Sequence, residues 1–318
     1  MECTGQNSSL GNHTALVEFI LIGFSDVPNL QGFLFGVFLI IYFLILMGNS
    51  LIITITKVEP SLQTPMYFFL RNFSLLEICY VSVTVPRLLA DLCRQHGKIS
   101  FLSCAIQMYF FLILADTECF ILTAMAYDRY VAICNPLLYP VIMNDRLCMQ
   151  MAVACWTTAI PVHIGFTSMV FSSTFCGCNH LDHFFCEAPA VVQLICGDAF
   201  MIEMLLYLIT TLVASIPSFL IVGSYVKIVS TILRLPSATG RAKAFSTCFS
   251  HLMVVTLFYG SGICVYFKSK NSRSTGMDKF LSLFYTILIP ILNPIIYCLR
   301  NKDAMVALEK FLHKWIVL

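Results

Sequence analysis

The sequence predicts an all-α membrane protein, a bundle of seven helices that each cross the bilayer. Its 318 residues are 58% hydrophobic and only 11% charged, with a mean hydropathy of +0.84. A soluble domain of this length would need a more strongly charged surface. The apolar residues are gathered into seven blocks, each reaching the roughly 20 residues that a helix needs to span the hydrocarbon core. These blocks are 32–56, 66–86, 99–127, 147–171, 200–226, 244–267 and 280–299.

Short polar stretches separate the blocks and leave no room for a separate soluble domain. The expected organisation is an extracellular glycosylated tail over residues 1–31, a transmembrane domain over 32–299 and a cytoplasmic tail over 300–318. We expect a short amphipathic helix in the cytoplasmic tail.

Lysine and arginine orient the bundle. The first 56 residues contain neither, and Lys57 directly follows the first block. With the N-terminus outside, 12 of the 19 basic residues fall on the cytoplasmic side, which fits the positive-inside rule. These are Lys57, Arg71, Arg129, Arg146, Lys227, Arg234, Arg241, Lys243, Arg300, Lys302, Lys310 and Lys314. The connection between the sixth and seventh blocks opposes the rule, since it holds four basic residues. Because the first helix usually dominates insertion, we expect an extracellular N-terminus at the plasma membrane.

The N-terminal segment carries two glycosylation acceptors, Asn7-Ser-Ser and Asn12-His-Thr, which suit an extracellular tail. It lacks the basic start and the early apolar run of a cleavable signal peptide. The first helix is therefore expected to act as its own signal anchor.

Five of the fifteen cysteines lie where the chain is expected to leave the bilayer on the outer side, which is oxidising and favours disulfides. A metal site built from Cys178, His183 and Cys186 is the alternative. Five cysteines cannot all pair among themselves, so one, Cys178 by preference, is left over or pairs with Cys93. The five are Cys104, Cys176, Cys178, Cys186 and Cys196.

Ionisable groups inside a membrane are costly and therefore mark candidate functional sites. Glu77 and Glu118 fall at similar depths in the second and third blocks. Two such carboxylates either share a proton or a small ion such as Na⁺, or each bonds separately to neighbouring helices. Asp128 and Arg129 lie near the cytosolic boundary, where a charge pair is tolerated.

Four prolines interrupt three of the blocks, at Pro161, Pro217, Pro290 and Pro294. Each removes a backbone hydrogen bond and creates a kink or a flexible point. Such points favour a protein that changes conformation over an inert bundle.

An ordered set of motifs resembles the odorant receptors, within the rhodopsin-like G-protein-coupled receptors, over nearly the whole chain. The most specific is Met125-Ala-Tyr-Asp-Arg-Tyr-Val-Ala-Ile-Cys134 at the end of the third block, and His183-Phe-Phe-Cys186 resembles the tetrapod class II branch. The others are Gly48-Asn49, Pro65-Met-Tyr-Phe-Phe-Leu70, Ser224-Tyr225, Lys243-Ala-Phe-Ser-Thr-Cys-Phe-Ser-His-Leu252, Asn293-Pro-Ile-Ile-Tyr297 and Leu299-Arg-Asn301. The sequence departs from the family pattern at Glu77, where most members have Asp, and at Gln63 and Asn135, which replace common histidines.

The resemblance implies a receptor that couples to a stimulatory, olfactory-type G protein and raises cAMP. It also implies disulfides Cys104–Cys186 and Cys176–Cys196. Arg129 is expected to be exposed on the inner face and to reach backbone carbonyls of the G protein. No acid stands in 234–251 to restrain it, so Asp128 with Ser246 or Thr247 would hold a loosely latched resting state. The expected coupling and switch residues are Asp128, Arg129, Tyr130, Tyr225, Asn293, Pro294 and Tyr297.

Helical spacing outward from Arg129 places a ligand cavity in the outer half of the bundle. Each residue could equally be ordinary packing, but together they describe a small apolar cavity with a few hydroxyls, suited to small, mostly neutral volatile molecules. The set is Met108, Phe111, Leu112, Ala115, Leu206, Ile209, Thr210, Val213, Tyr259, Gly262, Ile263, Tyr266, Leu283 and Thr286. Phe111 stands where amine receptors carry an Asp. Asp116 is about a turn deeper and is expected to turn toward the fourth or fifth helix rather than to bind an amine.

Two other classes of protein are disfavoured. A transporter would show similarity between its two halves, and the sequence shows none. An enzyme would need a nucleophile with its base, or a metal site, at one depth, whereas His163 and His251 look isolated. We therefore expect no catalysis.

Overall fold

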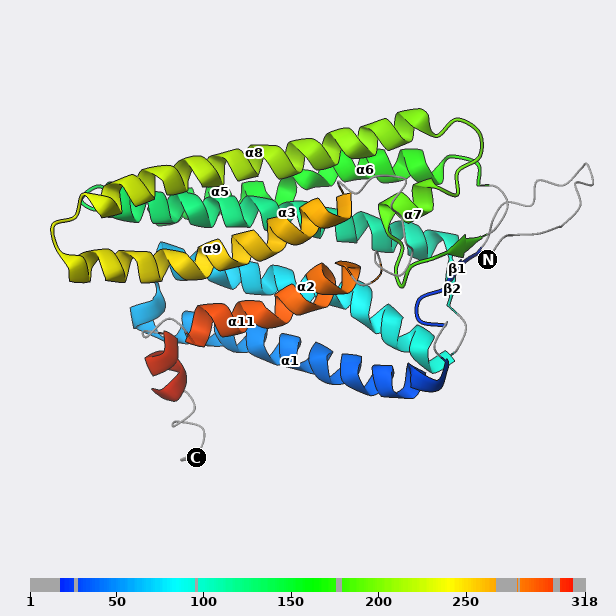
Figure 1. Cartoon of the computed structure of the whole chain (residues 1–318), viewed down its shortest axis with the longest axis horizontal. Helices are drawn as coiled ribbons and strands as arrows, with labels where there is room; N and C mark the ends of the chain where they lie inside the picture. The colour runs from blue at the N-terminus through cyan, green and yellow to red at the C-terminus, as the bar shows by residue number, and fades with distance from the viewer. Residues whose placement is uncertain are drawn as a thin grey trace, which may run out of the picture.

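Long helices run side by side along one axis in the computed structural model (Figure 1). The structure describes residues 18–25, 28–94, 97–175, 179–266, 279, 281–299 and 304–310, without the side chains of 243, 247, 263–266, 298 and 299. The long helices are α1 (Gln31–Val58), α2 (Pro65–Arg94), α3 (Phe101–Cys134), α5 (Asp145–Thr157), α6 (Ala159–Phe171), α8 (Phe200–Leu233), α9 (Ala238–Tyr266) and α11 (Ile289–Leu299). The shorter elements are η1 (Pro28–Leu30), η2 (Pro60–Leu62), α4 (Tyr139–Ile142), α7 (Ala188–Val192) and a π-helical turn, η4 (Phe284–Leu288).

Six helical segments among the described residues are long and apolar enough to cross a membrane, with α5 and α6 together forming one of them. A seventh apolar segment, Leu281–Tyr297, is shorter. Large apolar side chains such as Phe33, Phe43 and Phe219 expose more than half of their surface on the outside of the bundle, as lipid contact requires. The predicted seven-helix bundle is confirmed.

Helix α3 lies at the centre of the bundle and packs against α2, α5, α6, α8 and α9. Its sequence explains this position, because apolar and small side chains occupy all of its faces and seventeen of its residues are buried. A helix that is apolar all round belongs in the interior. Most side chains along α3 therefore meet another helix.

Two of the predicted prolines change the local helix. The fourth span divides into α5 and α6 at Thr158, because Pro161 lacks an N–H and its ring crowds the carbonyl one turn earlier. The π-helical turn η4 ends just before Pro290. Pro290 also lacks an N–H to give to the carbonyl one turn earlier, and the helix widens there. Pro217 and Pro294 stay within continuous helices, as does Pro86, which the sequence reading had not singled out.

A small sheet closes one end of the bundle, here called the sheet end (Figure 1). The helix over residues 304–310 lies toward the other end, here called the α4 end. Strand β1 (Glu18–Leu21) is the middle strand, antiparallel to β2 (Lys98–Ser100) and parallel to β3 (His180–Leu181). Phe19 is fully buried and its ring contacts those of Phe101, Phe171 and Phe175. Residues 18–25 are thus packed structure rather than the simple tail that the sequence suggested.

The C-terminal region forms the predicted short amphipathic helix over residues 304–310. Ala304 and Ala307, three residues apart, are buried, whereas Val306 between them is half exposed. Residues three apart share one face of a helix, so this face packs on the bundle.

Gly97 gives the first testable prediction. The Leu21 amide donates to the Gly97 carbonyl at 2.8 Å, and a Cβ at Gly97 would lie 2.0 Å from the Leu21 carbonyl oxygen. Gly97→Ala is therefore expected to separate β1 from β2 and to lower the thermal unfolding temperature by several degrees, since about 1 kcal/mol shifts it by roughly 2–4 °C in a chain of this size. In α6, Gly165→Ala meets no atom within 4 Å and is the matched control. Equal unfolding temperatures for the two variants would contradict the prediction.

Candidate functional site

A cavity lies between α3, α6, α8 and α9, toward the sheet end. It contains about 910 Å³ of empty space, including its mouth. Its lining is mostly apolar, with a few hydroxyl groups and one acid beside one histidine. This mostly apolar lining with a few polar groups is typical of sites that take small organic ligands.

Nine of the predicted ligand residues line this cavity: Phe111, Leu112, Ala115, Leu206, Ile209, Thr210, Val213, Tyr259 and Gly262. Met108, Leu283 and Thr286 do not. Met108 is fully buried in the apolar cluster beneath the sheet, and Thr286 donates its hydroxyl to the Ser282 carbonyl within its own helix. The side chains of Ile263 and Tyr266 lie outside the described residues.

The cavity also has lining residues that the sequence reading missed: Tyr80, Asp116, Cys119, His163, Phe166, Ala214, Phe258, Ser261 and Tyr285. Tyr80, His163 and Phe166 come from α2 and α6, two helices that the prediction did not use. The spacing of three between His163 and Phe166 places them on one face of α6 and could have identified that helix. In the seventh span, the π-helical turn changes the spacing at which side chains share a face. The prediction assumed regular helical spacing there and therefore missed Tyr285.

Asp116 and His163 form a contact inside the cavity. His163 Nε2 lies 2.7 Å from Asp116 Oδ2. The acid thus turns toward the fourth span, as expected. The expectation that His163 is isolated is wrong, because α3 places an acid directly opposite it.

The loop before α8 packs beside the cavity, against its lining residue Phe111. The disulfide Cys104–Cys186 ties this loop to α3, and the Cys186 amide donates to Gln107 Oε1 at 3.0 Å. The Phe185 ring then contacts the ring of Phe111, with 4.6 Å between centroids. The loop is therefore fixed to the first turns of α3, beside the cavity.

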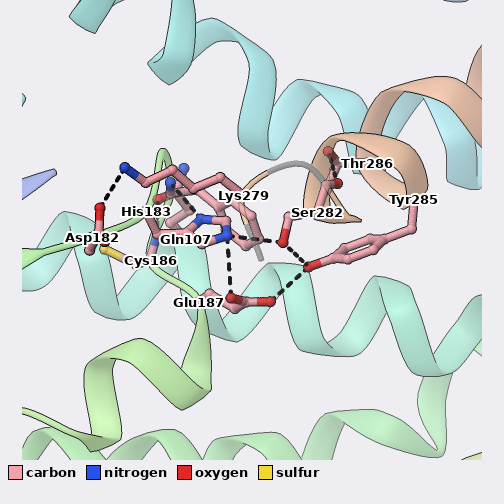
Figure 2. A network of polar contacts seen from close by, with 10 residues as sticks. Gln107, Asp182, His183, Cys186, Glu187, Lys279, Ser282, Tyr285 and Thr286 are labelled. Carbon is pink, nitrogen blue, oxygen red and sulfur yellow. Dashed lines mark hydrogen bonds and ion pairs between the residues drawn. The ribbon is translucent and has the colours of Figure 1, made fainter. Parts of the chain in front are cut away.

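A polar network joins the same loop to the seventh span (Figure 2). Tyr285 donates its hydroxyl to Glu187 Oε1 at 2.7 Å, and His183 Nε2 lies 3.0 Å from the Ser282 hydroxyl and 3.3 Å from Glu187 Oε2. Lys279 Nζ pairs with Asp182 Oδ1 at 2.5 Å farther out. Because Tyr285 also lines the cavity, this network connects the loop to the ligand space.

The other cysteine predictions have mixed outcomes. Cys196 is disulfide-bonded, but its expected partner Cys176 lies outside the described residues, as does Cys178. Cys93 is free, so its suggested pairing is wrong. The alternative metal site is wrong as well, because the Cys186 sulfur is consumed by its disulfide. The glycosylation candidates Asn7 and Asn12 lie outside the described residues.

Deeper in the bundle, Glu77 and Glu118 are buried within electrostatic range of each other. The Asn293 side-chain amide donates to Glu77 Oε1. Glu77 Oε2 and Glu118 Oε1 are buried without a hydrogen-bond partner. The two acids therefore leave unsatisfied oxygen atoms of the kind that a proton or a hard cation satisfies.

At the α4 end, Asp128 is held by neighbours on two elements. Tyr139 on α4 donates its hydroxyl to Asp128 Oδ1 at 2.8 Å, and Arg129 Nη2 lies 3.7 Å from Asp128 Oδ2. Burial and the nearby Asp128 carboxylate raise the pKa of Tyr139 above its ordinary value, so its hydroxyl keeps the proton that it donates. The Arg129 side chain is only 11% exposed, so the expectation that it is exposed is wrong in this conformation.

Helix α9 is tied to the bundle by His251. Its Nδ1 lies 2.8 Å from the Tyr225 hydroxyl of α8, and its Nε2 lies 3.1 Å from the Leu122 carbonyl oxygen of α3. His251 is thus not isolated, contrary to expectation. Tyr225 and Tyr297 both lie within electrostatic range of Arg129, whereas the side chain of Thr247 lies outside the described residues. Tyr130 at the same end is partly buried against the core, and Pro294 packs on Gly48 of α1.

The bundle and its cavity have the architecture of a seven-helix transmembrane receptor. Residues 38–314 match the olfactory receptor family. The chain is 56% identical to human olfactory receptor 10AG1 over 94% of its own length and 99% of that protein. It is 50% identical to human olfactory receptor 10A7, over 94% of this chain and 95% of the relative, and 50% identical to human olfactory receptor 10A5, over 98% of both. The chain belongs to the olfactory receptor family, whose members are multi-pass membrane receptors and not enzymes.

Proposed function

We propose that the receptor binds small, mostly neutral volatile organic molecules in its cavity and activates a heterotrimeric G protein of the stimulatory, olfactory type, which raises cAMP. The apolar cavity between α3, α6, α8 and α9 carries this proposal. An apolar cavity favours molecules that lose little hydration on entering it, and it disfavours charged ligands that find no opposite charge there. The names of the human relatives agree with an odorant as ligand.

The sheet end is proposed to face outward at the plasma membrane. The Cys104–Cys186 disulfide supports this orientation, because disulfides persist in oxidising surroundings. The excess of Lys and Arg at the α4 end is also the arrangement expected on the cytosolic side. Asn7 and Asn12 would then be accessible for glycosylation.

We propose the α4 end as the G-protein site. Asp128, Arg129, Tyr225 and Tyr297 gather there from three helices. A guanidinium can donate to several carbonyl oxygens of an inserted helix at once, which suits Arg129 to this contact. Ligand binding would favour a conformation in which α9 moves and Arg129 becomes accessible.

A Na⁺ ion or a shared proton is proposed between Glu77 and Glu118. The buried oxygen atoms without hydrogen-bond partners on both acids support it, and their donor set fits a hard cation. Thermal stability measured in NaCl and in KCl of equal ionic strength tests the ion. Equal stability in the two salts would argue against a bound Na⁺ ion and leave the shared proton as the remaining proposal.

The function is tested by filling the cavity. Gly262 lines the cavity, and a Cβ there meets no atom within 4 Å, so Gly262→Leu is expected to occupy ligand space without disturbing the backbone. In cells that express the olfactory-type G protein, odorants that raise cAMP through the wild type are expected to lose at least about tenfold in potency on this variant, since burying a leucine-sized group in the site removes comparable ligand contacts.

Gly223→Leu is the matched control, because Gly223 lies on the exposed face of α8 and also meets no atom within 4 Å. It is expected to respond as the wild type does at equal surface expression. Identical odorant responses from the two variants would exclude this cavity as the binding site. If no odorant in a broad panel changed cAMP through the wild type, the function itself would be contradicted.

A further inference from the structure

Two ionisable side chains meet inside the apolar cavity, and neither belongs to the ligand-binding set that the sequence predicted. Asp116 comes from α3 and His163 from α6, and both line the cavity. His163 Nε2 lies 2.7 Å from Asp116 Oδ2. An ionised carboxylate only accepts hydrogen bonds, so the imidazole is the donor in this contact. His163 therefore uses Nε2 for its hydrogen bond to Asp116.

The two side chains are covered to different extents. His163 exposes 3% of its side chain and Asp116 exposes 14%. Asp116 is therefore the member of the pair that a molecule in the cavity can reach more readily. A carboxylate offers about four lone-pair positions, and His163 occupies only one of them. The acid retains the capacity to accept further hydrogen bonds.

Helix α9 contributes two hydroxyl groups to the cavity, and that of Tyr259 is buried without a hydrogen-bond partner, whereas that of Ser261 is engaged. Ser261 already gives its hydroxyl proton to the Phe258 carbonyl at 2.8 Å. At Asp116 itself, a ligand oxygen that only accepts hydrogen bonds would face the lone pairs of the carboxylate, and a ligand carboxylate would face a second carboxylate. Both arrangements leave a buried polar group unsatisfied, which is costly in an apolar site.

We propose that Asp116 anchors ligands whose head group donates a hydrogen bond, that is, alcohols and amines carried on an apolar body. His163 is a positioning residue that holds the carboxylate in place. This inference rests on the proposed function and specifies the ligand class of the same cavity. The apolar lining from α8 and α9 accepts the body of the ligand, and the acid selects its head group.

The test compares four probes with one alkyl chain: octanol, octylamine, octanal and octanoic acid. Potency is measured as cAMP in cells, at matched surface expression. The wild type is expected to favour octanol or octylamine over octanal and octanoic acid by about tenfold or more, the usual effect of a hydrogen bond to a charged group. A higher potency for octanol than for octylamine would indicate that the cavity prefers a neutral donor, and the reverse order would indicate that it prefers a charged one.

Asp116→Asn sharpens the test, because the amide keeps an acceptor and adds a donor. Octanal is expected to gain potency relative to octanol on this variant, by about tenfold in their ratio. His163→Phe removes the positioning contact and is expected to weaken the preference, whereas His163→Gln, whose amide can donate to Asp116, is expected to restore part of it. Asp91→Asn is the control, since Asp91 is an acid paired with Arg87 on α2, away from this cavity. Its order of ligand potency is expected to match the wild type.

The outcomes separate this inference from the function on which it rests. An equal loss of potency for all four probes on Asp116→Asn would make Asp116 a structural residue and overturn the inference. A wild-type preference for octanal or octanoic acid would overturn it too. If none of the four probes acts, but other odorants give responses that Gly262→Leu removes, the inference fails and the function stands. If no odorant of any class raises cAMP, the proposed function itself fails.

Discussion

Replacing Arg129 with alanine is expected to abolish agonist-dependent cAMP while leaving odorant binding within about twofold of the wild type. The side chain lies at the α4 end, far along α3 from the cavity, and its contact in this conformation is Asp128. An alanine removes all five guanidinium donors that could reach the G protein. Loss of signal with retained binding assigns the effect to coupling. The measurement pairs a cAMP assay with competition binding on membranes.

Arg146→Ala is the matched control, because Arg146 is an exposed arginine on α5 at the same end. It removes the same charge and is expected to signal nearly as the wild type does. Retained signalling by Arg129→Ala would show that the G protein binds elsewhere on the receptor. Loss of signalling by both variants would indicate a general requirement for positive charge rather than a specific contact.

His251→Leu is expected to raise agonist-independent cAMP. The leucine removes the contacts with Tyr225 and the Leu122 carbonyl that tie α9 to α8 and α3. Each buried hydrogen bond contributes about 1 kcal/mol, so losing both can shift the balance of conformations by about tenfold or more. Residues 234–251 contain no acid, so the sequence supplies no negative charge there to restrain Arg129. The contacts of His251 are therefore more important for holding α9 in place.

Thr256→Val is the control on the same helix. Thr256 is exposed and donates only to the Leu252 carbonyl within α9. Its basal cAMP is expected to equal that of the wild type at the same surface level. A basal signal from His251→Leu that is no higher than from Thr256→Val would mean that His251 contributes to packing and not to the resting state.

The number and order of the membrane spans could be predicted from the sequence because spanning a bilayer imposes a minimum apolar length. The packed strand β1 could not, because its partners β2 and β3 lie about 80 and 160 residues away and short strands carry little local signal. The prolines predicted where helices weaken. They did not predict which would break, since Pro161 divides its span and Pro217 does not.

The cavity was predicted best on α3 and α8, whose helices are regular enough for spacing to identify one face. It was predicted poorly on the seventh span, where the π-helical turn rotates Tyr285 into the lining. The pair Asp116 and His163 was missed because two residues 47 positions apart carry no joint signal in a single sequence. The same reason hid the contact between His251 and Tyr225.

The position of β1 has a consequence for how the receptor is made. Its residues emerge from the ribosome before any span, yet β1 can complete its pairing only after residues 180–181 have been synthesised and have returned to the same side. The Phe19 side chain therefore stays exposed, without its final packing, while four spans are inserted. A chaperone that shields this segment during translation would act on the interval between the synthesis of β1 and that of β3.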